Sequence, residues 1–153
     1  MKVLIPSAGI GSRLGDLTRY YNKAMVSLGK RPIISHIMDT YPASTEFVIA
    51  LGYKGDYLRQ YLELAYPQVR ITFVEVDRYD GPGTGLGYTL KKCSKYLDSE
   101  FVFHANDSII VDDGLRFPME TDTMLLARGT PDPKNYRTVS FDGESKLVTA
   151  IHD

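Results

Sequence analysis

Short apolar runs alternate with segments of helical periodicity along the first two thirds of the chain. The runs are rich in β-branched and aromatic residues and are bounded by turn-forming residues, as buried strands are. They lie at 2–5, 46–51, 70–76 and 100–105. Between them, apolar residues recur at helical spacing within 32–41, 56–65 and 86–97. Because parallel strands need crossovers of about this length, the alternation predicts helical crossovers and a parallel sheet.

The helical segments carry start signals and apolar faces. Pro32 is suited to the first turn of the first helix, and Asp56 to the N-cap of the second. Ala65 and Leu86 are expected on the inward faces of the second and third helices, and Cys93 shares the face of Leu86. We therefore interpret Cys93 as a buried core residue rather than a nucleophile.

The pattern changes after residue 105, where strand-like runs follow one another without intervening helices. These runs lie at 123–128, 137–141 and 146–152, and "FDGESK" supplies turn-forming residues between the last two. The predicted fold class is therefore α/β: a Rossmann-like three-layer α/β/α sandwich with a mostly parallel mixed sheet and antiparallel strands toward the C-terminus. We expect residues 1–153 to be one domain truncated at its C-terminus, because the chain ends inside a strand-like run.

Composition narrows the functional classes. The 153 residues carry a net charge of −1, with a pI of about 6.3. This balance gives no general attraction to nucleic acid or to a membrane surface, so we expect neither as a partner. The single cysteine excludes an internal disulfide and suits a reducing compartment. With no apolar run of about 18 residues and no signal peptide, the cytoplasm is the expected location.

The first strand leads directly into a glycine-rich turn. Gly9, Gly11 and Gly15 let the backbone bring its N–H groups close to an anion, at the sheet edge where α/β folds bind ligands. A P-loop is excluded because no lysine follows Gly15. A near-match to the dinucleotide fingerprint, with its third glycine one residue late, leaves an NAD(P)-dependent Rossmann oxidoreductase as an open alternative. A third interpretation is that the side chains of Arg13 and Lys23 bind the oxygens of a polyphosphate.

Three stretches at matching spacing resemble the signature of the sugar-phosphate nucleotidyltransferases, the nucleoside-diphosphate-sugar pyrophosphorylase family. They are "AGIGSRL" at 8–14, "NK" at 22–23 and "GKRPII" at 29–34. Serine at 12 stands where the family has threonine, and asparagine at 22 where it has proline. The resemblance implies a catalytic domain over 1–153 with Arg13 and Lys23 as catalytic residues. It also implies nucleotide binding by Ala8, Gly9, Gly11 and Ser12.

A second glycine-rich stretch extends the resemblance. "DGPGTGLGYTLKK" at 80–92 corresponds to the loop that packs against the nucleobase in this family. The resemblance therefore implies nucleotide binding by Gly83, Thr84 and Gly85. A small, glycine-lined loop favours CTP or UTP, and dTTP stays open.

The strand-like run "FVFHAND" at 101–107 ends where the family has its metal-binding aspartate. The resemblance implies that Asp107 is catalytic and binds Mg²⁺, and that Asn106 belongs to the nucleotide site. A hard carboxylate at the end of a strand suits Mg²⁺, which takes one or two carboxylates together with waters and substrate phosphates. His104 shows no metal-ligand spacing and is interpreted as strand packing.

Toward the C-terminus the resemblance implies acceptor binding. Tyr136 matches a segment that lines the sugar site in the family, Arg137 replaces a glycine there, and Asp153 falls where a sugar-binding glutamate is expected. A second metal carboxylate is expected beyond residue 153.

The implied reaction transfers a nucleoside monophosphate from a triphosphate to a sugar-1-phosphate or similar phosphorylated acceptor. It releases pyrophosphate and gives a nucleoside-diphosphate sugar for surface polysaccharide synthesis. A cytidylyltransferase that uses CTP and phosphocholine, or another small phosphorylated alcohol, is an alternative in the same class. A nucleotide-binding module without turnover is an alternative in another class. Formation of a homo-oligomer stays open.

Overall fold

The computed structural model describes residues 1–111, 122–123 and 138–152. The chain divides into two compact units, Met1–Pro118 and Met119–Asp153. The first unit contains the parallel sheet and its helices, and the second contains an antiparallel hairpin. Each unit is described by itself.

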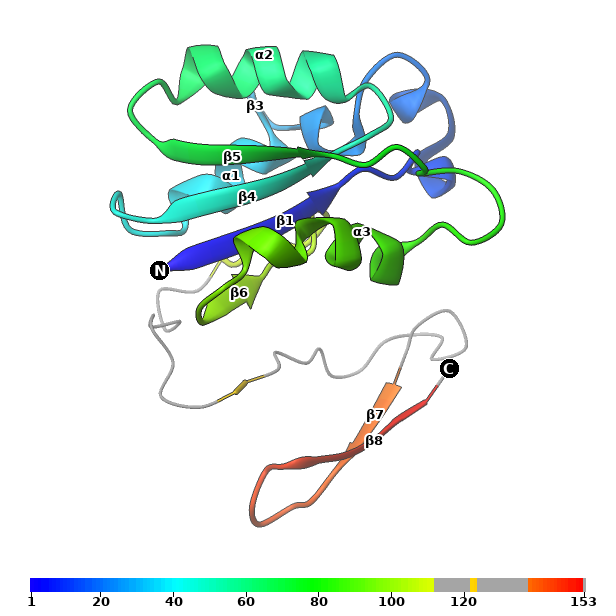
Figure 1. The fold of residues 1–153 in the computed structure, drawn as a ribbon, viewed down its shortest axis with the longest axis vertical. Helices are drawn as coiled ribbons and strands as arrows, with labels where there is room; N and C mark the ends of the chain where they lie inside the picture. The colour runs from blue at the N-terminus through cyan, green and yellow to red at the C-terminus, as the bar shows by residue number, and fades with distance from the viewer. Residues whose placement is uncertain (112–121, 124–137, 153) are drawn as a thin grey trace. The chain divides into compact units, whose positions relative to one another are not determined.

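The first unit is built on four parallel strands in the order β5-β4-β1-β6 (Figure 1). The strands are β1 (Lys2–Ser7), β4 (Glu46–Leu51), β5 (Arg70–Glu75) and β6 (Phe101–Phe103). In the central pair, Lys2 lies opposite Glu46 and Ser7 opposite Leu51. The parallel sheet predicted from the apolar runs is confirmed, with β6 shorter than its run because only Phe101–Phe103 pair with β1.

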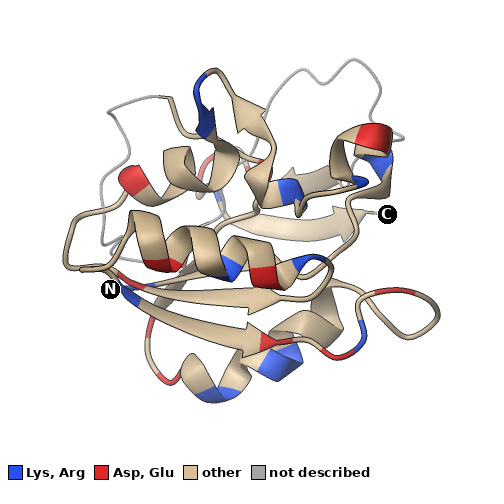
Figure 2. Ribbon diagram, turned by 90° about the horizontal axis from the view of Figure 1, so that it is seen from above, with Lys and Arg blue, Asp and Glu red and all other residues tan. Residues whose placement is uncertain are grey.

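Helices cover both faces of this sheet, and Figure 2 shows the strands between the helical layers. The helices are α1 (Ile33–Asp39), α2 (Gly55–Ala65) and α3 (Leu86–Cys93). Alternate residues of β1 point to opposite faces: Val3 and Ile5 pack with α1 and α2, whereas Leu4 packs in the cluster that contains Cys93 of α3. The predicted three-layer arrangement is confirmed.

The helices confirm some of the predicted core and cap residues and contradict others. Cys93 is completely buried, and burial raises the pKa of its thiol to about 11, so its prediction as a core residue is confirmed. The predicted cap at Asp56 is wrong: the residue before α2 is Lys54, in the left-handed conformation with φ 53°, and Asp56 lies in the first turn. Ala65 and Leu86 are exposed rather than inward. Both belong to end turns of their helices, beyond the turns that contact the sheet.

Short elements connect β1 to α1. They are the 3₁₀ helices η1 (Ser12–Thr18) and η2 (Lys23–Met25) and the small hairpin of β2 (Ser27–Leu28) and β3 (Arg31–Pro32). Pro32 immediately precedes α1, in agreement with its predicted place at the start of that helix.

The second unit contains the antiparallel pair β7 (Thr138–Phe141) and β8 (Val148–His152). Their connection is a turn in which Asp142 Oδ1 accepts a hydrogen bond from the backbone N–H of Ser145 at 2.7 Å. The antiparallel strands predicted for 137–141 and 146–152 are confirmed within the described residues, whereas most of 123–128 lies outside them.

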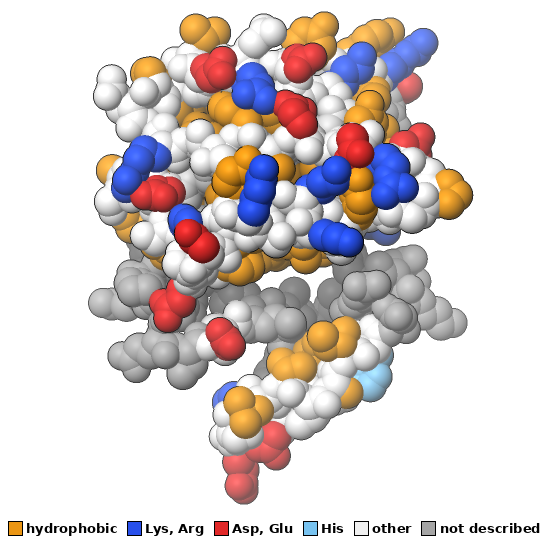
Figure 3. Space-filling model, in the orientation of Figure 1, with side chains coloured by type: hydrophobic (Ala, Val, Ile, Leu, Met, Phe, Trp, Pro, Cys, Tyr) orange, Lys and Arg blue, Asp and Glu red, His pale blue; other side chains and the backbone are white. Residues whose placement is uncertain are grey.

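Basic and acidic side chains are interspersed on the face of the first unit shown in Figure 3. Several are paired: Lys92 lies 2.8 Å from Asp77, and Lys2 is paired with Asp98. In the described part of the chain, the helices lack the combined length and apolar content needed to span a bilayer.

Candidate functional site

The strand order creates a topological switch point between β1 and β6. From β1 the chain passes through α1 to β4 on one side, and from β5 it returns through α3 to β6 on the other side. The loops that follow β1 and β6 therefore lie next to each other at the carboxyl edge, at the point where the strand order reverses. Open α/β sheets bind ligands at such points.

The glycine-rich turn after β1 packs closely on Lys23. Gly11 has a left-handed conformation with φ 69°, and a Cβ added to it would lie 3.1 Å from both Lys23 Cβ and Thr18 Cγ2. The Thr18 hydroxyl donates to the carbonyl oxygens of Gly11 and Gly15 at 3.3 and 3.2 Å. Only a glycine fits at position 11 without strain or crowding.

Asn22 lies beneath this turn with a completely buried side chain. Its amide nitrogen donates to the carbonyl oxygens of Ser7 and Tyr53, each at 2.7 Å. Its amide oxygen accepts from the backbone N–H of Ala24 at 2.9 Å and so caps η2, which begins at Lys23. One side chain thus connects the end of β1, the loop after β4 and the start of η2.

The ammonium group of Lys23 meets the carboxylate of Asp107, with Nζ 2.5 Å from Oδ2. The two side chains are 23% and 51% exposed, so the pair is open to solvent on one side. Lys23 belongs to the connection that leaves β1, and Asp107 to the loop after β6. The structure therefore brings these two predicted site residues together at the switch point.

A buried histidine anchors the loop that carries Asp107. His104 Nε2 lies 2.9 Å from the carbonyl oxygen of Ser108, so Nε2 carries the proton, and Nδ1 accepts from the Tyr41 hydroxyl at 2.6 Å. Burial lowers the pKa of His104 and raises the pKa of Tyr41 to about 12, which favours this neutral pair. The interpretation of His104 as packing is confirmed, and its hydrogen bonds also hold both ends of the turn around Asp107.

The remaining predicted residues of the first turn differ in exposure. Arg13 and Ser12 lie in η1 with exposed side chains, and none of the ion pairs found among the described residues involves Arg13. Ala8 is buried and its carbonyl accepts from the backbone N–H of Tyr53 at 2.9 Å. Ala8 therefore supports the turn, whereas Arg13 is accessible to a ligand.

The second glycine-rich stretch forms an open loop between β5 and α3. Gly81, Gly83 and Gly85 have φ values of 85°, 77° and 125°, and a Cβ added to any of them would have no neighbour within 4 Å. The Thr84 hydroxyl donates to the Gly81 carbonyl at 2.7 Å, so its lone pairs are left for a ligand. Backbone groups around Gly83 and Gly85 are accessible from outside.

The other predicted site residues are distributed as follows. Asn106 is 9% exposed and directly precedes Asp107. Tyr136, Arg137 and Asp153 lie outside the described residues. In the described part of the chain there is no group of three or more His, Cys, Asp or Glu side chains arranged to hold a metal ion.

Sequence reasoning missed the bridging role of Asn22. Its signal was available in part, since an asparagine before a short helical turn is a common N-cap. The bonds to Ser7 and Tyr53 had no local signal, because Tyr53 is 31 residues away in the chain.

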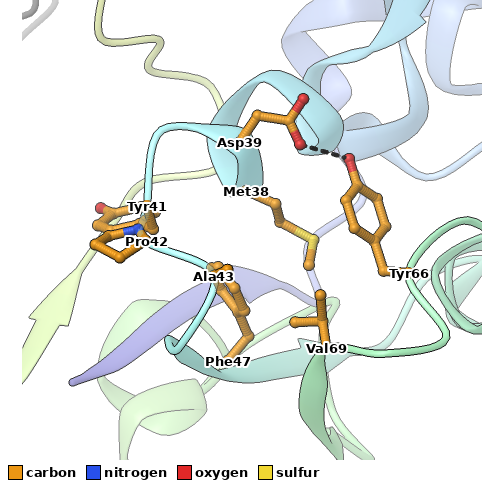
Figure 4. A pocket seen from close by; sticks show the side chains of 8 residues that line it. All are labelled: Met38, Asp39, Tyr41, Pro42, Ala43, Phe47, Tyr66 and Val69. Carbon is orange, nitrogen blue, oxygen red and sulfur yellow. Dashed lines mark hydrogen bonds between the residues drawn. The ribbon is translucent and has the colours of Figure 1, made fainter.

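A hollow of about 300 Å³ lies at the opposite edge of the sheet, where β4 and β5 begin (Figure 4). The Tyr66 hydroxyl at its rim donates to Asp39 Oδ1 at 3.1 Å. It is lined by Met38, Asp39, Tyr41, Pro42, Ala43, Phe47, Tyr66 and Val69. The hollow is separate from the carboxyl-edge loops that hold Lys23 and Asp107.

Comparison of the sequence with known proteins finds no matching family model but several relatives. The chain is 27% identical over 149 residues to the bifunctional protein GlmU of Methanocaldococcus jannaschii, covering 97% of this chain and 35% of that protein. It is 28% identical over 131 residues to the glucose-1-phosphate cytidylyltransferase of Salmonella typhimurium, covering 71% of this chain and 51% of the relative. The chain thus spans between a third and about half of the length of these relatives.

Solved structures share the fold. HddC from Yersinia pseudotuberculosis matches 99% of this chain and 68% of its own, with a TM-score of 0.68 and 20% identity. The CTP:phosphocholine cytidylyltransferase LicC from Streptococcus pneumoniae matches 75% of this chain and 48% of its own, with a TM-score of 0.59 and 25% identity. The motifs stand at the family's spacing and the relatives include a sugar-phosphate cytidylyltransferase, so these similarities fit a sugar-phosphate nucleotidyltransferase family.

Proposed function

We propose that this chain forms the nucleotide-binding part of an enzyme that transfers a nucleoside monophosphate from a triphosphate to a sugar-1-phosphate, with release of pyrophosphate. The observation that carries the proposal is the meeting of Lys23 and Asp107 beside the Gly11 turn. A cation, a carboxylate and a glycine turn at one switch point are the groups that a triphosphate and its metal require.

The proposed chemistry joins two anions. An oxygen of the acceptor phosphate attacks the α-phosphorus and the pyrophosphate leaves, so the protein must neutralise charge and align the reactants. We assign Lys23 to the α-phosphate and the acceptor, because its ammonium is held at the switch point. We assign Arg13 and the backbone N–H groups of the first turn to the departing phosphates, because Arg13 is exposed on the adjoining 3₁₀ helix.

Asp107 fits the requirements of Mg²⁺. Its carboxylate is about half exposed and already holds a cation, the Lys23 ammonium. A single carboxylate outside any three-ligand cluster of the described residues is unsuited to zinc but suits Mg²⁺, which completes its coordination with waters and substrate phosphates. When bound, the ion would neutralise charge on the triphosphate.

We propose CTP or UTP as the nucleotide and glucose-1-phosphate as the first acceptor to test. The relatives include enzymes named for cytidylyl and uridylyl transfer to glucose-1-phosphate, and the open Gly83–Gly85 loop leaves its backbone accessible to a base. Phosphocholine is a second acceptor candidate because of the likeness to LicC at 25% identity. The acceptor roles of Tyr136, Arg137 and Asp153 and the cytoplasmic location remain predictions.

The test is a pyrophosphate-release assay with Mg²⁺ and each of CTP, UTP, dTTP and ATP, with glucose-1-phosphate or phosphocholine as acceptor. We expect release with CTP or UTP that depends on both the acceptor and Mg²⁺. An Asp107→Asn variant should lose turnover by about 10²–10³-fold, as expected for removing one preorganised charge. Triphosphate binding without release would favour a nucleotide-binding module. Thermal protection by a nicotinamide cofactor but by no triphosphate would favour an oxidoreductase.

A further inference from the structure

The buried side chain of Asn22 connects three segments at the carboxyl edge. Its amide nitrogen donates to Ser7 at the end of β1 and to Tyr53 in the loop after β4, both at 2.7 Å. Its amide oxygen caps the N–H of Ala24 at 2.9 Å. All the hydrogen-bonding groups of the amide are thus directed at backbone atoms, and the side chain has no exposed surface.

These bonds fix the backbone on both sides of Lys23. Asn22 precedes Lys23, and the N–H of Ala24 follows it. The stem of Lys23 is confined on another side by Gly11, where a Cβ would lie 3.1 Å from Lys23 Cβ and 3.5 Å from Lys23 Cδ. Held in this way, the ammonium lies 2.5 Å from the Asp107 carboxylate.

We infer that Asn22 is a positioning residue, whose amide bridge between the ends of β1 and β4 sets the place of the Lys23 ammonium opposite Asp107. The catalytic role of Lys23 in this inference rests on the proposed function, whereas the placement of its ammonium by Asn22 does not. The resembled signature has proline at this position. Asn22 has φ −63° and ψ 145°, values that a proline also adopts, so the backbone angle alone would be retained by proline. The bridge between the two strand ends would not.

Loss of the bridge has a defined consequence. Ser7 and Tyr53 would keep carbonyl groups at the edge without their amide donor, and the loop would move to let water reach them. A displacement of about 1 Å at a group that aligns reactants costs about 10²-fold in rate. We therefore expect the variants to lose more turnover, through displacement of the Lys23 ammonium, than their loss of folding stability alone would explain.

Three variants remove the bridge in different ways. Asn22→Ser keeps an oxygen that can cap Ala24 but is too short to bridge the two carbonyls. Asn22→Asp keeps the size and the cap, but its ionised carboxylate has no donor for the two carbonyls and would be buried against them. The proline variant therefore covers the case in which both of the others unfold the chain. Asn22→Pro retains the backbone angle alone. Ile37→Val serves as a control, because Ile37 is completely buried in the α1 side of the core and lies away from the edge.

The first measurement is the rate at which Lys23 reacts with an amine-modifying reagent, relative to exposed Lys30, by mass spectrometry of the peptides. Lys23 should react more slowly than Lys30 in the wild type. Asp107→Asn should raise the relative rate by about two- to fivefold, the factor that corresponds to a partly exposed ion pair. The relative labelling rate of Lys23 should rise similarly in the three Asn22 variants. In Ile37→Val this rate should stay unchanged, although the melting temperature falls by about as much as in the Asn22 variants.

The second measurement is turnover. We expect kcat to fall by about 10- to 100-fold in the three Asn22 variants, with a smaller change in KM for the triphosphate. If Asn22→Pro keeps wild-type labelling, or if the other two do, the amide bridge does not position Lys23. If the wild type releases no pyrophosphate, the proposed function fails while the labelling experiment still decides the placement.

Discussion

Replacing Lys23 by methionine separates charge from packing at the candidate site. The methionine side chain keeps an apolar stem of similar length, so the packing of this stem beside Gly11 is largely retained. What is removed is the ammonium that lies 2.5 Å from Asp107. The variant therefore tests whether that charge serves the reaction or the fold.

The two effects differ in size. The Lys23–Asp107 pair is 23% and 51% exposed, so solvent screens it and its loss should cost about 0.2–1 kcal/mol of unfolding free energy. For a chain of this length that corresponds to a fall of at most about 4 °C in melting temperature. Removal of a preorganised charge from the transition state costs about 2.7–4 kcal/mol, or about 10²–10³ in kcat.

The assay is pyrophosphate release at saturating Mg²⁺ and triphosphate, with melting followed by circular dichroism. Lys30→Met is the matched control, because Lys30 is an exposed lysine in the β2–β3 turn. We expect a large loss of kcat with little loss of stability in Lys23→Met and neither in Lys30→Met. Wild-type turnover in Lys23→Met would refute the catalytic role of the charge. A melting temperature lowered far more than the ion pair allows would mean that the lysine supports the fold.

Three further predictions concern the support of the site and the core. Gly11→Ala should lower the unfolding free energy by about 1–2 kcal/mol because Gly11 has a left-handed φ of 69°. Gly9→Ala is the control and should leave it unchanged, because no atom lies within 4 Å of the added carbon. Equal unfolding midpoints of the two variants in urea would contradict this prediction. Burial raises the pKa of Cys93 from 9.0 to about 11, so the stability present below pH about 9 should be lost as pH rises through about 11, and less steeply in Cys93→Ala. Tyr41→Phe removes the hydroxyl that donates to buried His104 and should cost about 1–3 kcal/mol; an unchanged thermal melt would contradict it.

The strands were predictable because buried parallel strands leave a strong local signal. The run at 46–51 is apolar on both faces, whereas the run at 70–76 alternates apolar with polar residues, and the structure forms β4 and β5 there to within a residue. Helix starts were less predictable. Asp56 is a good N-cap by type, but α2 begins earlier, where Gly55 packs against Leu51 and a Cβ would lie 2.9 Å from Leu51 Cβ. A close approach between a helix and its preceding strand therefore overrode the capping preference.

The candidate site was predictable only up to the order of the strands. The first turn and Asp107 both follow strands of a parallel sheet, so their common edge could be inferred from the sequence. The contact between Lys23 and Asp107 could not be inferred from strand positions alone, because it depends on β6 pairing with β1 rather than with β5. Adjacent strands lie about 4.8 Å apart, so β6 beside β5 would stand three spacings from β1, about 14 Å away. That exceeds the reach of a lysine side chain. The pairing of Lys23 with Asp107 is thus a consequence of the reversal in strand order between β1 and β6, and of the long α3 crossover that carries the chain back past β1.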